Sequence, residues 1–156
     1  MANDGKLLER KLQEGLQRFT EQRPSFFHRF YDTRSARGLL PAQPGDFFWL
    51  LPGIPAILIE AKSTEEGTPL RDLIDPAQVG KHRLWRRAGH LTYLVYLQLD
   101  KDELQWVPSD KVSEKTILPS VWSGSLDDID EMLDCVHNFL CRLNFHGNNK
   151  SKPSFS

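Results

Sequence analysis

The sequence has few cysteines, and their spacing favours neither a disulfide nor a metal site. Cys135 and Cys141 lie six residues apart in a stretch with helical periodicity, where positions i and i+6 face different sides. A zinc site needs more ligands than two cysteines. We therefore expect reduced cysteines, which are typical of a cytosolic protein.

Long apolar runs and net charge are also lacking. No apolar run approaches the roughly 20 residues that a membrane-spanning helix needs, and residues 1–10 are polar rather than those of a secretory signal. A net charge of −1 excludes a chain that coats nucleic acid by bulk charge. These features predict a cytoplasmic protein without a membrane partner, in which nucleic-acid binding would depend on a local basic patch.

The sequence does contain two local groups of basic residues. No acid occurs between Asp75 and Asp100, and this interval holds Lys81, Arg83, Arg86 and Arg87 with His82 and His90 among them. The second group is Arg23, Arg29, Arg34 and Arg37. A solvated helix face is the alternative interpretation of each group.

The order of apolar patterns predicts an α/β protein with a mixed central sheet of about four to five strands flanked by helices. The length of 156 residues fits a single domain, expected over residues 1–145, with a disordered tail at 146–156. The segment from Ser25 to Pro44 is expected to be irregular. The predicted elements are a helix over 6–19, a hairpin of strands 46–51 and 56–62, a helix over 76–88 capped by Asp75, strands over 91–99 and 104–107, and a last helix that begins at a capping pair of Ser125 and Asp128.

The most informative stretch is Pro44-Gly45-Asp46 followed by Ile59-Glu60-Ala61-Lys62. Strand alternation puts Glu60 and Lys62 on one face, and the hairpin would bring Asp46 beside Glu60. A charged pair directly after an apolar run costs free energy to bury, unless the charges are solvated or take part in binding or catalysis. Two carboxylates suit a hard cation such as Mg²⁺, and a neighbouring lysine suits phosphodiester hydrolysis.

These residues resemble the PD-(D/E)xK nuclease superfamily and, within it, most closely the RecU-type Holliday-junction resolvases. The resemblance covers roughly residues 24–99 and includes the Glu-Ala-Lys strand, a following helix with Gln78, and the strand from Leu91. It implies a restriction-endonuclease-like core. The chain departs from the family where Gln43-Pro44-Gly45 replaces the usual Ser-Thr before the aspartate.

The resemblance assigns roles to specific residues. The catalytic candidates are Asp46, Glu60, Lys62 and Gln78, and the candidate ligands of Mg²⁺, for which Mn²⁺ can substitute, are Asp46, Glu60, the Ala61 carbonyl and Glu9. Glu14 competes with Glu9 on the first helix. The candidate DNA contacts are Arg29, Arg34, Arg37, Lys81, His82, Arg86 and Arg87.

The expected function is that of a metal-dependent DNA endonuclease, a Holliday-junction resolvase acting as a homodimer in recombination or repair. Four-way junction DNA is the expected partner, and a bacterial or phage-infected cell would suit the short chain. Two alternatives remain open. One is a nuclease of the same superfamily that cuts ends, flaps or defined sequences, and the other is a DNA-binding module of this fold without cleavage. Taken singly, Asp46 would fit a turn aspartate, and Glu60 with Lys62 would fit an exposed ion pair at a strand end.

Overall fold

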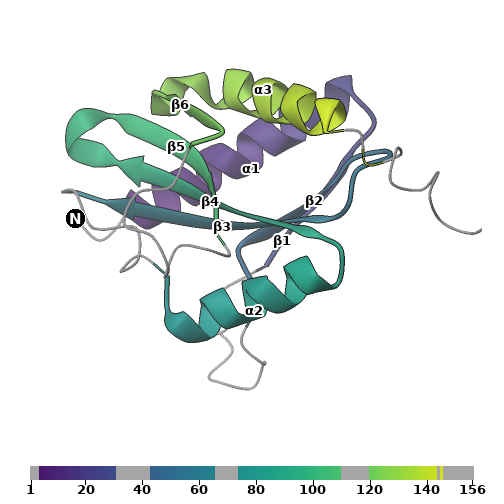
Figure 1. Cartoon of the computed structure of the whole chain (residues 1–156). Coiled ribbons are helices and arrows are strands. Elements are labelled where there is room, and N and C mark those ends of the chain that lie inside the picture. The colour runs from purple at the N-terminus through teal and green to yellow at the C-terminus, as the bar shows by residue number, and fades with distance from the viewer. Residues whose placement is uncertain (1–3, 31–42, 66–73, 110–119, 144, 146–156) are drawn as a thin grey trace, which may run out of the picture.

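The protein is a layered α/β structure, seen in a computed structural model that describes residues 4–30, 43–65, 74–109, 120–143 and 145 (Figure 1). Its elements follow one another as α1 (Asp4–Gln22), β1 (Phe26–Arg29), β2 (Phe47–Leu50), β3 (Ile57–Thr64), α2 (Pro76–Arg87), β4 (Leu91–Gln98), the 3-10 helix η3 (Leu99–Lys101), β5 (Glu103–Pro108), β6 (Trp122–Gly124), the 3-10 helix η4 (Leu126–Asp128) and α3 (Ile129–Arg142).

Within the described ranges the strands form one six-stranded sheet in the order β1-β2-β3-β4-β5-β6. β3 and β4 are parallel and are connected through α2, and the other neighbours are antiparallel. The prediction of an α/β protein with a mixed sheet flanked by helices is therefore confirmed. The sheet has more strands than the four to five expected, because neither β1 nor β6 had been anticipated.

The expectation that the segment from Ser25 to Pro44 is irregular is wrong at its beginning. Residues Phe26 to Arg29 form β1, which pairs with β2 in the register Phe26 to Leu50 and Arg29 to Phe47. Four residues are too short a run for periodicity to distinguish a strand from a loop. Residues 31–42 of the segment lie outside the described residues.

Helices cover both faces of the sheet (Figure 1). On one face α1 and α3 pack over a large apolar core, to which β3 contributes Ile57, Ile59 and Ala61. On the other face α2 covers a smaller cluster, which is Ile74, Val79, Leu94, Tyr96 and Val107. All residues of β4 except the last are buried, which confirms that this strand is central.

The termini of the predicted elements are set by local chemistry. Asp75 accepts a hydrogen bond from the Ala77 N–H at 2.9 Å, and Pro76 begins α2 as expected. Gly89 follows the end of α2 with a φ of +93°, a conformation that glycine adopts without strain. Ser125 and Asp128 form the predicted capping box, although it opens η4 and not α3 directly.

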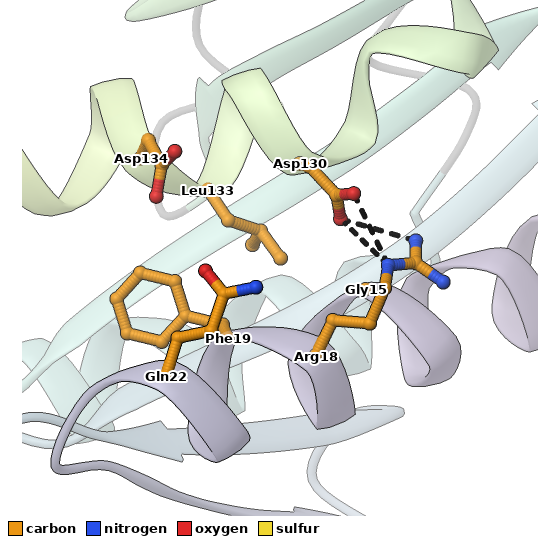
Figure 2. Close-up of a pocket in the computed structure, with 7 residues that line it drawn as sticks. All are labelled: Gly15, Arg18, Phe19, Gln22, Asp130, Leu133 and Asp134. Carbon is orange, nitrogen blue, oxygen red and sulfur yellow. Dashed lines mark hydrogen bonds and ion pairs between the residues drawn. The ribbon is translucent and has the colours of Figure 1, made fainter.

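A groove lies between α1 and α3 and is bridged at one end by an ion pair (Figure 2). Arg18 donates to both carboxylate oxygens of Asp130 at 3.1 Å, and Arg23 pairs with Asp134 at 3.3 Å. Its lining residues come only from these two helices, so it is separate from the carboxylates of the predicted active site.

In the part of the chain that the structure describes, no helix has the length and apolar character to cross a membrane.

Candidate active site

The predicted motif Pro44-Gly45-Asp46 is held against β3 by close backbone contacts. The Asp46 N–H donates to the Ile59 carbonyl at 2.9 Å. A Cβ on Gly45 would lie 3.0 Å from the Leu58 side chain and 3.1 Å from that same carbonyl, so a larger residue would force its neighbours to shift by a few tenths of an ångström. This close approach brings Asp46 to its place opposite Glu60, because the neighbouring pair in the register is Phe47 with Ile59.

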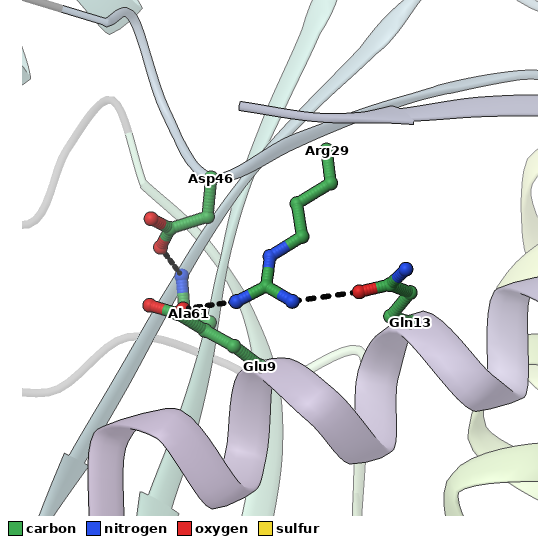
Figure 3. Close-up of polar contacts among 5 residues, drawn as sticks. All are labelled: Glu9, Gln13, Arg29, Asp46 and Ala61. Carbon is green, nitrogen blue, oxygen red and sulfur yellow. Dashed lines mark hydrogen bonds and ion pairs between the residues drawn. The ribbon is translucent and has the colours of Figure 1, made fainter. Parts of the chain in front are cut away.

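Asp46 is anchored to the strand that carries the other acidic residue. Its Oδ2 accepts a hydrogen bond from the Ala61 N–H at 2.7 Å (Figure 3). The pKa of Asp46 is raised from 3.8 to about 8, chiefly by burial and also by the negative charges of Glu60 and Glu9, while the hydrogen bond from Ala61 and the charge of Lys62 oppose this rise. A carboxyl group with so high a pKa lacks enough positive charge and hydrogen-bond donors around it to stabilise its charged form.

Glu60 is almost fully buried, with 3 % of its surface exposed, and is only partly neutralised. Its Oε1 lies 3.3 Å from Nζ of Lys62, which is itself 37 % exposed. Burial raises the pKa of Glu60, while the charge of Lys62 and hydrogen bonds from Lys62 and Gln78 oppose that rise. Its Oε2 is buried without a hydrogen-bond partner among the described residues. Strand alternation and burial thus bring Asp46, Glu60, Lys62 and Gln78 together as predicted.

Glu9 lies near enough to this pair that its negative charge raises the pKa of both Asp46 and Glu60. Its Oε2 accepts a hydrogen bond from Arg29 at 2.9 Å, and the same guanidinium donates to Gln13 Oε1 at 2.7 Å (Figure 3). Glu14, the competing residue, is exposed. The structure therefore favours Glu9 over Glu14 as the acid of α1 beside the site.

The side chains fit a divalent cation held by two carboxylates. Among the residues that the structure describes, no three His, Cys, Asp or Glu side chains are grouped closely enough to hold a metal ion, so Glu9 does not complete a three-carboxylate set. Asp46 and Glu60 provide the carboxylate oxygens, and the unpartnered Oε2 of Glu60 is available for a cation. The Ala61 carbonyl faces the same edge of β3 as its N–H, by the alternation of a strand, and so lies on the side of Asp46.

His82 does not occupy the position expected of a DNA contact. Its side chain is fully buried, with Nδ1 2.6 Å from Ser109 Oγ and Nε2 3.1 Å from the Pro44 carbonyl. The prediction that it contacts DNA is therefore wrong. His82 instead connects α2 to the backbone that precedes Asp46. The sequence does not predict the contacts of His82 with Pro44 and Ser109, because these residues are far apart in the chain and come together only in the folded protein.

The other predicted DNA contacts differ in how far their side chains are available. Lys81 and Arg87 are exposed on α2. Arg86 is half-buried, donates to the side chain and carbonyl of Thr92 at 3.4 Å, and lies 5.6 Å above the Tyr93 ring. Arg29 is directed to Glu9. The remaining candidates, Arg34 and Arg37, lie outside the described residues.

Gln13 was missed as part of this environment, although its position offered a signal. It follows Glu9 by four residues, so the two share a face of α1.

Comparisons with known proteins find a distant likeness among solved structures. The sequence matches no protein-family model and no curated protein. Among solved structures, the chain is similar to the 1.6 Å structure of Archaeoglobus fulgidus Hjc, a Holliday junction resolvase from an archaeal hyperthermophile, with 20% sequence identity, a TM-score of 0.43, and coverage of 64% of this chain and 72% of that one.

Proposed function

We propose that this protein is a metal-dependent nuclease that hydrolyses phosphodiester bonds in DNA. The observation that carries the proposal is the placement of a half-buried Asp46 beside a buried Glu60, with one buried oxygen of Glu60 left without a hydrogen-bond partner near Lys62. Two acids that are wholly or partly removed from water, and are not fully compensated, destabilise a fold. A cation that compensates them is the simplest reason to keep both.

Each residue has a distinct role in this proposal. Asp46 and Glu60, with the Ala61 carbonyl, would hold Mg²⁺, or Mn²⁺ in its place. The bound ion would supply a Lewis acid that polarises the phosphoryl oxygen and lowers the pKa of a water. Lys62 donates hydrogen bonds from Nζ to the attacking water and the phosphate, which offsets the charge that develops in the transition state. Gln78 orients Glu60, and Glu9 adds negative charge that favours a cation.

The preferred substrate in this proposal is a four-way DNA junction, following the resemblance to resolvases of the RecU type. Resolution requires two symmetric cuts, so a homodimer with two sites related by a two-fold axis is the expected active species. A nuclease that cuts flaps, ends or defined sequences is the second candidate. A module that binds without cleaving is disfavoured by the grouping of both acids with Lys62.

The test is a cleavage assay with a labelled four-way junction, a matched duplex and a single strand, each in Mg²⁺ and in EDTA. We expect cleavage only with the metal, at the highest rate on the junction. Light scattering at micromolar concentration would report about twice the chain mass for a dimer. A monomer that cuts flaps or duplex ends, but not junctions, would favour the second candidate.

A substitution identifies the site within that assay. Asp46→Asn keeps an acceptor for the Ala61 N–H and should leave the protein folded and bound to DNA, but without cleavage. Glu14→Gln, at an exposed position on α1, serves as the control and should cut at the wild-type rate. Cleavage by the Asp46→Asn variant at that same rate would overturn the assignment of the site.

A further inference from the structure

An aromatic surface lies on β1 and β2, next to the carboxylates. It consists of Phe26, His28, Phe30 and Phe48, whose rings contact one another with centroids 5.2 to 6.2 Å apart. Phe26 is 56% exposed and His28 is exposed, while Phe30 and Phe48 are half-buried. Phe47 and Trp49, which alternate with Phe48, lie in the core on the opposite face of the sheet. Within the described residues, the four rings of the aromatic surface belong to neither apolar cluster.

The sheet register places this surface directly beside Asp46. Arg29 pairs with Phe47, so the next pair along the two strands is Phe30 with Asp46. The Phe30 N–H donates to the Asp46 carbonyl at 2.8 Å. Phe48 follows Asp46 by two residues, so strand alternation puts both on the same side of the sheet as Glu60. An aromatic surface and the cleavage site thus form one continuous face.

The charges around this face favour a polyanion over a protein partner. β1 and β2 contain no acid, and α2, which covers the same side of the sheet, contains basic residues and no acid. A chain of phosphates can therefore approach from either side of Asp46 and Glu60 without repulsion from these elements. A second protein copy seated on the aromatic rings would instead cover the side from which a phosphate has to reach the carboxylates.

We propose that the aromatic surface binds unstacked nucleobases next to the phosphate that is cut. Aromatic side chains stack on bases of any sequence, and such contacts are the usual way in which single strands are held. The stacked pair of His28 and Phe48, with 5.4 Å between centroids and 30° between planes, provides a flat ring at the surface. This inference rests on the proposed function, and it specifies that the nucleotides at the cleavage site are unpaired when the DNA is bound.

The test measures binding separately from cleavage. Fluorescence anisotropy in EDTA compares a duplex with the same duplex carrying a short unpaired stretch, while 2-aminopurine in that stretch reports base stacking. The variant is Phe26→Leu combined with Phe48→Leu, which keeps apolar surface but removes two aromatic faces. Leu84→Ala, at a position 63% exposed on α2, is the control.

We expect wild-type protein to bind the unpaired substrate at least about tenfold more tightly than the duplex, and the double variant to lose about tenfold for the unpaired substrate alone. Phe48→Tyr should retain the preference. Wild-type affinity in the double variant, or an equal loss for both substrates, would overturn the inference. So would a wild-type dimer that Phe26→Ser dissociates, because a second copy would then occupy the surface.

Two further readouts keep the outcomes distinct. A melting curve checks folding, and if the double variant unfolds, Phe26→Leu alone gives the answer because this side chain is mostly exposed. Cleavage by the wild type in Mg²⁺ is recorded in parallel. A preference for unpaired bases without any cleavage would contradict the proposed function while supporting the aromatic surface, and cleavage without the preference would do the reverse.

Discussion

Replacing Asp46 by asparagine should stabilise the metal-free protein at alkaline pH. The pKa of Asp46 is raised from 3.8 to about 8 in the folded protein, chiefly by burial. Between these two pH values the folded state binds more protons than the unfolded state, so the free energy of unfolding falls as the pH rises. Above about pH 8 the full cost is present, and Asp46→Asn removes it.

The size of the effect follows from the same two pKa values. Their difference is about 4, and at about 1.4 kcal/mol for each pKa unit the ceiling is about 6 kcal/mol. Asp46 keeps some contact with water, and a metal-free site relaxes, so about 2 kcal/mol is the realistic expectation. For a chain of this length that corresponds to a melting temperature about 5 °C higher.

The assay is thermal unfolding in EDTA at pH 5 and at pH 9, followed by circular dichroism. The Asp46→Asn variant should melt close to the wild type at pH 5 and above it at pH 9. Asp100→Asn, at an exposed position on η3, is the control and should show no such difference. Adding Mg²⁺ should raise the melting temperature of the wild type more than that of the variant. A variant no more stable than the wild type at pH 9 would refute the reasoning.

Three further predictions follow from the surroundings of the site. Replacing Lys81 and Arg87 by alanine should reduce the slope of log K for DNA against log salt by about 2, and an unchanged slope would show that α2 does not touch phosphate. Gly45→Ala should lower the melting temperature, since its Cβ would lie 3.0 Å from a side-chain carbon of β3. Gly80→Ala meets open space in α2 and should add about 0.5–1 kcal/mol, so equal shifts for the two variants would contradict the packing argument. His82→Ala removes the partner of the buried Ser109 hydroxyl and of the Pro44 carbonyl and should cost about 2–4 kcal/mol in urea unfolding, whereas a loss below about 0.5 kcal/mol would mean that His82 does not hold the backbone before Asp46.

The central part of the fold was predictable because its signals are local. The β2–β3 hairpin is marked by Pro52 and Gly53 between two apolar runs, and α2 by Asp75 and its following proline. β4 is apolar along its whole length, as a strand buried on both faces has to be. The common face of Glu60 and Lys62 was also predictable, since alternate side chains of a strand point to the same side.

The outer strands could not be predicted in the same way. β1 and β6 have four and three residues and acquire their identity only by pairing with a neighbour. β1 alternates, with Phe26 and His28 pointing outward and Phe27 and Arg29 pointing inward. This pattern can be interpreted only when the face of the sheet that α1 covers is known. A sequence without its fold cannot say which side of so short a strand is covered.

The roles of charged residues near the site depend still more on tertiary partners. Glu9 and Glu14 are five residues apart, which separates their directions by about 140° around a helix, so only one of them can face the sheet. The packing of α1 selects Glu9. Arg29, expected at the DNA, then pairs with Glu9 instead. Glu9 therefore lies near Asp46 and Glu60 while it is paired with Arg29. In the proposed cation site, Glu9 would adjust the local charge and would not be a direct ligand.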